Sequence, residues 1–213
     1  MNALGMLEVY SFTTVVCAAD IAAKAADVKV IAFDRTRPKT EAVPAPLVMQ
    51  MKIEGDNAAV KAAIEASSEY AKKEGMYIIS HVIPRPGEEM EKMAYLLDVN
   101  KDKYNKKLPK TFYGTDMEAP EVDFAIGLLE VSGLVASITG LDAMLKAAEV
   151  RLIHSEKRLG GRLVTLIVKG SVSAVKAAVE AGAKAAEPLG KLHGQAVIAR
   201  PHGEIMKFFD YET

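Results

Sequence analysis

Short β-branched apolar runs alternate with longer alanine-rich runs along the 213 residues of the chain. A short run of β-branched and apolar residues predicts a strand, whereas an alanine-rich run without helix breakers predicts a helix. The first half contains predicted strands over 4–10, 28–33, 47–54 and 76–83 and predicted helices over 14–26, 58–73 and 87–97. The second half contains predicted strands over 126–132, 150–155, 163–169 and 194–199 and predicted helices over 136–148, 172–187 and 203–209. Two β-α-β units in each half predict an α/β layer architecture, in which a single sheet is covered by helices.

The predicted elements repeat because the sequence itself repeats. Ala3–Val9 returns as Ala125–Val131 at a spacing of 122 residues, and Val82–Pro86 returns as Val197–Pro201 at a spacing of 115. Self-similarity over this length indicates a duplicated domain. The chain is therefore predicted to contain a first domain, a linker and a second domain, over 1–97, 98–123 and 124–213.

One loop accounts for the change in spacing between the two copies. The second and third strands of the first copy are joined by 34–46, whereas those of the second copy are joined by the shorter 156–162. Within the shorter loop, Arg158–Arg162 places two glycines between two arginines. A pair of glycines is also common in any tight strand-to-strand turn. Taken alone, this loop leaves both a functional and a purely structural interpretation open.

Composition and charge exclude several classes of function. Half of the residues are hydrophobic and 26% are charged, which is typical of a soluble globular protein with a sizeable core. The formal net charge of -1 offers no general attraction for nucleic acid or for an anionic membrane. The start Met1–Gly5 lacks the pattern of a secretory signal, and no stretch approaches the length of a transmembrane helix. We therefore expect a cytoplasmic protein that binds neither nucleic acid nor membranes.

The candidate chemical groups do not form a catalytic or metal-binding set. The four histidines have no counterparts in the other copy and lack metal-ligand spacing; they are His81, His154, His193 and His202. Cys17 lies in an apolar predicted helix without a second thiol, so we expect it to be inert. Glu8 and Glu130 recur at matching positions within apolar strands, which indicates a buried carboxylate bonded to backbone or to a lysine. We therefore expect no catalytic residues, no metal and no cofactor, and hence no enzyme.

Several separated phrases resemble one known family. They are Ala125–Glu130, Leu141–Ala148, Leu163–Gly170 and Ile83–Pro86. Together they resemble the shell-protein domain of bacterial microcompartments, and the resemblance covers both copies but not the linker. In tandem members of that family, three chains form a ring that imitates a hexamer. The resemblance therefore implies two unpermuted shell domains per chain, each a variant of the ferredoxin-like fold, and a pseudohexameric homotrimer. It further implies a flat structural tile in the microcompartment shell, a central pore for metabolite passage, and contacts with other shell proteins and with encapsulated enzymes.

The resemblance assigns the loop between the second and third strands of each copy to the pore. Glycine lets the backbone approach the axis closely, and rings of Arg or Lys favour anions. We therefore expect a pore that prefers small anionic metabolites. Its predicted lining comprises Arg35, Thr36, Arg37, Pro38, Lys39, Arg158, Leu159, Gly160, Gly161 and Arg162. Neither loop contains a cysteine, so the iron–sulfur cluster that some family members carry is not expected.

Four basic residues match the positions through which neighbouring tiles of the family meet, and these are Lys24, Arg85, Lys146 and Arg200. Both lysines end alanine-rich helices, where a cation also simply complements the helix dipole. Lysine nevertheless recurs at the same place in both copies, and its long side chain is able to reach carbonyl groups of a neighbour. We therefore predict that these residues make tile-edge contacts.

A second interpretation is a trimeric ferredoxin-like regulatory protein that binds a small molecule. Duplicated β-α-β domains also occur in such signalling proteins, where a long loop such as 34–46 would hold an effector at the subunit cleft. Flat sheets at high protein concentration would favour the shell tile. A discrete trimer with saturable nucleotide binding would favour the regulator.

Overall fold

The computed structural model of the chain describes residues 2–38, 42–88, 90, 94, 121–156 and 162–209. The first domain contains β1 (Ala3–Tyr10), α1 (Phe12–Ala25), β2 (Val28–Thr36), β3 (Val48–Gly55), α2 (Asn57–Lys73) and β4 (Tyr77–Ile83). The second domain contains β5 (Ala125–Ser132), α4 (Leu134–Ala147), β6 (Val150–Glu156), β7 (Leu163–Gly170), α5 (Val172–Ala186), β8 (Leu192–Ile198) and α6 (Gly203–Met206).

Each domain is built on one four-stranded antiparallel sheet. The strand orders are β2-β3-β1-β4 and β6-β7-β5-β8, so the helix of each β-α-β unit joins two strands that a third strand separates. Even the irregularities repeat, because β1 shifts register against β4 after Glu8 and β5 shifts register against β8 after Glu130. The predicted α/β class and the two tandem domains, each a small sheet with helices, are confirmed.

Two glycines at matching positions let the helices approach the sheets closely. A Cβ atom on Gly5 would lie 2.7 Å from a methyl carbon of Val60 in α2. A Cβ atom on Gly127 would lie 2.5 Å from a methyl carbon of Val179 in α5. Any larger residue would push these helices away from the sheet. The repeated glycine therefore reflects packing of the core.

Two predicted boundaries differ from the structure by three residues, and the others within the described residues by at most two. β2 continues into the segment predicted as loop, because Arg35 and Thr36 pair with Met49 and Val48 of β3. The helix predicted over 203–209 ends at Met206, since the following residues form tight turns in which the N–H of residue 208 bonds to residue 205 and that of residue 209 to residue 206. The helix predicted over 87–97 lies largely outside the described residues.

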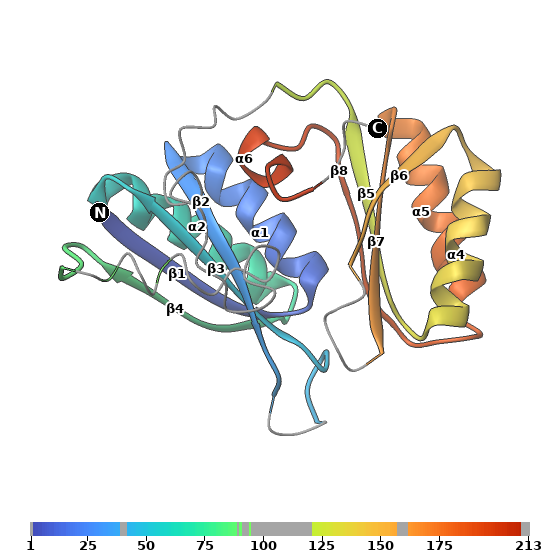
Figure 1. Cartoon of the computed structure of the whole chain (residues 1–213), viewed down its shortest axis with the longest axis horizontal. Helices are drawn as coiled ribbons and strands as arrows, with labels where there is room; N and C mark the ends of the chain where they lie inside the picture. Colours follow the sequence, from blue (N-terminus) through green and yellow to red (C-terminus); the bar gives the residue numbers. More distant parts are fainter. Residues whose placement is uncertain are drawn as a thin grey trace.

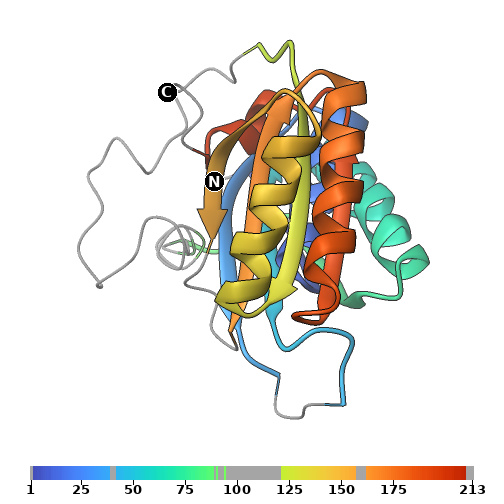
Figure 2. The ribbon, with the colours of Figure 1, turned by 90° about the vertical axis from the view of Figure 1, so that its right-hand side faces the viewer.

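In both domains the helices lie on the corresponding face of the sheet, as Figure 1 shows. Helices α1 and α2 cover one face of the first sheet, and α1 lies between the two sheets. Helices α4 and α5 cover the far face of the second sheet, where they lie side by side at the surface of the molecule (Figure 2). One face of each sheet is therefore covered by helices of its own domain. On the opposite face, α1 packs against the second sheet, and Ala94 packs with Leu4 and Ile31 on the first.

Candidate functional site

The start of α1 is held by a carboxylate of the other domain. Glu130 of β5 is buried and accepts hydrogen bonds from the Ser11 hydroxyl at 2.6 Å, the Thr13 N–H at 2.9 Å and the Phe12 N–H at 3.2 Å. These N–H groups belong to the helix end that has no partners within the helix, and a negative charge there also complements the helix dipole. The prediction of a buried carboxylate bonded to backbone is confirmed for Glu130. We call this contact between α1 and the second sheet the domain joint.

The apolar side of the domain joint is tightly packed. Phe12 and Val16 of α1 are fully buried. Across the joint, a Cβ atom on Gly194 of β8 would lie 2.9 Å from the Cβ of Thr13. Beside it, His193 Nε2 lies 2.8 Å from the Ser132 hydroxyl, and burial lowers the pKa of this histidine although Glu130 opposes the shift. The joint is therefore closed to solvent around the helix start.

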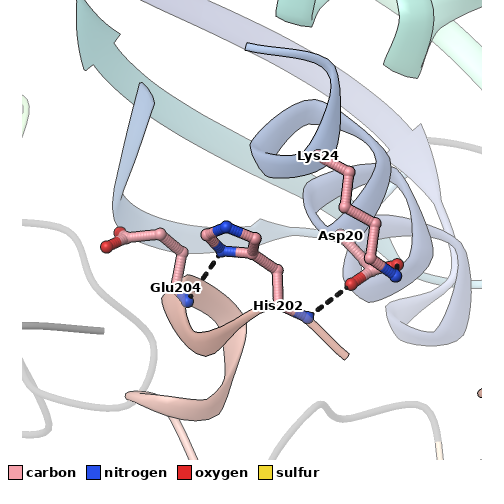
Figure 3. A network of polar contacts seen from close by, with 4 residues as sticks. All are labelled: Asp20, Lys24, His202 and Glu204. Carbon is pink, nitrogen blue, oxygen red and sulfur yellow. Dashed lines mark hydrogen bonds and ion pairs between the residues drawn. The ribbon is translucent and has the colours of Figure 1, made fainter. Parts of the chain in front are cut away.

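A second set of contacts ties α6 of the second domain to the first (Figure 3). Asp20 of α1 accepts a hydrogen bond from the His202 N–H at 2.7 Å and another from Lys24 Nζ at 2.5 Å. His202 in turn accepts from the Glu204 N–H through Nδ1 at 3.2 Å, and the Glu204 carboxylate accepts from the Val30 N–H at 2.9 Å. These bonds anchor the end of the second domain along α1 and β2.

Helix α4 is the counterpart of α1, yet its corresponding face is exposed. Leu134, Val135 and Ile138 are 60%, 69% and 59% exposed, and they match Phe12, Thr13 and Val16, which are buried in the domain joint. We call Leu134, Val135 and Ile138 the α4 surface. An exposed cluster of large apolar side chains at the start of one helix is typical of an interaction surface.

The face of the first sheet that α1 and α2 leave uncovered is the counterpart of the sheet face in the domain joint, and Met90 and Ala94 pack on one end of it. Met6, Glu8 and Tyr10 of β1 are half-buried, and Ile79 of β4, which pairs with Glu8, is 56% exposed. We call these four residues the β1–β4 surface. Their matching positions in the second sheet include Glu130 and Gly194, which α1 covers. The chain therefore exposes a counterpart of each half of the domain joint, one on each end.

The predicted edge residues fall into two groups. Lys24 and Arg200 come from different domains but line the same hollow of about 1050 Å³, together with Glu121 and Asp123. Lys146 instead lies on the exposed end of α4, where its Nζ is 2.6 Å from an Asp142 oxygen. Arg85 lines a smaller hollow of about 270 Å³ on the first domain. Lys24 and Arg200 therefore lie near each other, whereas Lys146 and Arg85 lie apart within the chain.

The predicted pore residues are only partly described. Arg35 and Thr36 end β2, Arg37 and Pro38 follow them, and Arg162 precedes β7 with a φ of 63°. Five predicted residues lie outside the described ranges, namely Lys39, Arg158, Leu159, Gly160 and Gly161. Below these loops, Asp34 forms a buried ion pair with Lys52. The Asp34 charge is therefore compensated inside the domain and does not offset the loop arginines.

Potential chemical sites are sparse in the described part of the chain. No group of three or more His, Cys, Asp or Glu side chains there is placed to hold a metal ion. Burial raises the pKa of the Cys17 thiol to about 11, although a hydrogen bond with Tyr70 opposes the shift. Among the helices that the structure describes, none combines the length and apolarity needed to cross a membrane.

Sequence reasoning missed the domain joint and the two surfaces that match it. The repeat placed Glu8 and Glu130 at equivalent positions but carried no information on which helix each would meet. The exposed fractions of equivalent residues distinguish the buried surfaces of the domain joint from their exposed counterparts.

Comparison with known proteins agrees with this duplicated architecture. The model of the BMC domain matches the chain twice, over 3–86 and 125–201. The carboxysome assembly protein CcmO of Synechococcus elongatus (strain ATCC 33912 / PCC 7942 / FACHB-805) is 36% identical over 205 residues, which cover 96% of this chain and 67% of CcmO. The bacterial microcompartment shell protein EutM of Salmonella typhimurium is 49% identical over 85 residues, which cover 40% of this chain and 88% of EutM.

One solved structure also spans the chain. A microcompartment protein from Desulfitobacterium hafniense DCB covers 97% of this chain and is itself covered to 99%, with 22% sequence identity and a TM-score of 0.37. The twofold domain match and the CcmO relative show that the chain belongs to the BMC-domain family of bacterial microcompartment shell proteins.

Proposed function

We propose that the protein is a structural tile of a microcompartment shell and that three copies close into a ring of six domains. The observation that carries this proposal is the domain joint, because the chain exposes an unmatched copy of each of its halves. The α4 surface of one copy would cover the β1–β4 surface of the next. Family membership supports the structural role, and the two exposed surfaces support the homotrimer.

The geometry of the contact favours a closed ring over a pair. A contact between a helix face and a sheet face is head-to-tail, and such contacts generate rings when the rotation closes and filaments when it does not. One such helix-to-sheet contact already exists within the chain, where α1 of the first domain packs on the second sheet. A tile of six similar domains requires three chains, each contributing one internal joint and one joint between copies.

The edge residues support a flat tile. Lys24 and Arg200 share one hollow across the domain joint. In the proposed ring, Lys146 of one copy and Arg85 of the next would stand in the same relation, because they are the counterparts of Lys24 and Arg200. Every outer edge of the tile would then carry one lysine and one arginine, through which other shell proteins attach.

Replacing Lys24 and Lys146 by Asp is expected to leave the trimer intact and to prevent its assembly into sheets. In the unchanged protein the lysine ammonium groups would donate to carbonyl oxygens of the neighbouring tile. Carboxylates at the same positions would be repelled by those oxygens. Electron microscopy of concentrated protein measures the outcome, with flat sheets expected for the unchanged protein. Ordered sheets from the double variant would contradict the edge assignment.

A single variant provides the matched control. Lys24 contacts Asp20, which also holds the His202 N–H, so Lys24→Asp places a second carboxylate beside the domain joint. Lys146 is exposed and contacts only Asp142 among the bonds found for it in the described residues. Lys146→Asp alone is therefore expected to keep the trimer mass and the helical circular dichroism while it weakens the sheets.

We also propose that the loops after β2 and β6 surround an opening for small anionic metabolites. Arg35 and Arg37 lie at the end of β2, and three copies of each would bias the opening towards anions. The buried Asp34–Lys52 pair supports this bias, since it leaves the arginine charges uncompensated by Asp34. Encapsulated enzymes would be the source or the destination of the metabolites.

A further inference from the structure

The two copies differ at two neighbouring positions of the joint, although the backbone there is the same. The Ser11 N–H bonds to the Leu47 carbonyl at 3.1 Å, and in the second copy the Gly133 N–H bonds to the Arg162 carbonyl at 2.8 Å. Both helix-capping residues have a positive φ, 76° for Ser11 and 101° for Gly133. Serine and leucine in the first copy are thus replaced by glycine and arginine in the second.

The arginine lies beside the place of the missing side chain. A Cβ atom on Gly133 would lie 3.5 Å from Nη2 of Arg162, which is ordinary contact, so the guanidinium lies next to the position that the side chain of Ser11 has in the first copy. In the domain joint, that serine donates the shortest of the three hydrogen bonds to Glu130. Arg162 therefore places donors at the start of α4 where the first copy has a hydroxyl.

A guanidinium at this place favours an anion opposite it once the boundary is closed to solvent. A positive charge at the start of a helix is unfavourable by itself, because the helix dipole is positive there. Helix α4 has no acidic side chain in its first turn and no side-chain cap. The counterpart of Glu130 is Glu8, which lies half-buried on the β1–β4 surface and accepts a hydrogen bond from Gln50 Nε2 at 3.2 Å.

We infer that Glu8 of one copy contacts two groups of the next copy. It accepts hydrogen bonds from the first N–H groups of that copy's α4 and forms an ion pair with that copy's Arg162. This inference rests on the closed trimer proposed above. It gives the joint between copies a charge pair in place of the Ser11–Glu130 hydrogen bond of the domain joint. It also gives Arg162 a role at the subunit boundary, beside the pore lining predicted from the sequence.

A charge exchange tests the inference on the full-length protein. Glu8→Arg and Arg162→Glu, each alone, are expected to weaken trimer formation by about tenfold or more, because each leaves like charges facing across a desolvated boundary. The double variant restores opposite charges and is expected to recover most of the lost affinity. Sedimentation velocity over a dilution series measures the monomer–trimer equilibrium of all four proteins.

Milder variants keep the test decisive if a reversed charge impairs folding. Glu8→Gln preserves the size of the side chain, and Arg162→Gln shortens it but keeps a hydrogen-bond donor. Both remove the charge, and the double variant is then expected to be no weaker than either single one. Gln50→Ala is the matched control, since it removes the bond that Glu8 makes inside the chain and is expected to leave the trimer unchanged. Single variants that form trimers as well as the unchanged protein, or effects that simply add, would overturn the ion pair. An unchanged protein that is monomeric would instead overturn the trimer itself.

Discussion

Val135→Asp is expected to leave the chain folded and to abolish the trimer. Val135 is largely exposed in the single chain, so the substitution costs little there. In the proposed ring the same position faces the β1–β4 surface, as its counterpart Thr13 faces Gly194. Breaking such a contact with an unpaired buried charge typically costs about 3–5 kcal/mol, which applies at every joint between copies. Trimer formation is therefore expected to weaken by more than about 100-fold.

Sedimentation velocity and circular dichroism together measure this effect. Leu189→Asp is the matched control, because Leu189 is also an exposed apolar residue of the second domain. Its counterpart in the first domain, Glu74, is exposed as well, so this position lies outside the joint. The control is expected to remain a trimer. A trimeric Val135→Asp protein would show that the α4 surface is not the contact between copies.

Glu130→Ala is expected to destabilise the chain by about 3 kcal/mol or more, because it leaves buried donors without an acceptor. The Ser11 hydroxyl and the N–H groups of Phe12 and Thr13 all lose their bonds to this carboxylate. Ser11 also loses an anchor for its positive φ of 76°, a conformation that favours glycine. Urea unfolding followed by circular dichroism measures the free energy of unfolding.

Glu8→Ala at the matching position is the control for Glu130→Ala. Both variants are best compared in the Val135→Asp background, in which the joint between copies is absent. Glu8 is then half-exposed and bonded to Gln50, so its removal is expected to cost less than about 1 kcal/mol. Equal losses for the two variants would contradict the role of Glu130 in the domain joint.

The sequence predicted the elements and the duplication well because both depend on local patterns. The apolar runs that form β1 and β5, and the glycines that lie under α2 and α5, recur at fixed spacing. β2 extends three residues beyond its predicted end, because Asp34–Thr36 interrupts the apolar pattern and is held in the strand by pairing with β3. Local patterns thus specify each domain, and long-range pairing decides where its strands end.

The candidate site was less accessible to sequence reasoning because it depends on contacts between the copies. The donors to Glu130 lie 117 to 119 residues away along the chain, and no pattern within a repeat indicates which copy supplies them. Phe12 and Leu134 are both apolar, although the first is buried and the second exposed. The family resemblance predicts Arg162 in the pore lining, and no pattern in the loop indicates that its guanidinium lies beside Gly133. Only the packed domains distinguish these environments.

Cross-linking between two introduced cysteines tests the closed ring most directly. Val135→Cys and Ile79→Cys are the counterparts of Thr13 and Gly194, whose Cβ positions are 2.9 Å apart, which is close enough for a disulfide to form after a small adjustment. The native Cys17 is buried and its pKa is raised to about 11, so it does not compete. Oxidation of the double variant is expected to give covalently joined trimers as the largest species on a denaturing gel, and neither single variant is expected to give them. Absence of cross-links, or a ladder that continues beyond three chains, would contradict the closed trimer.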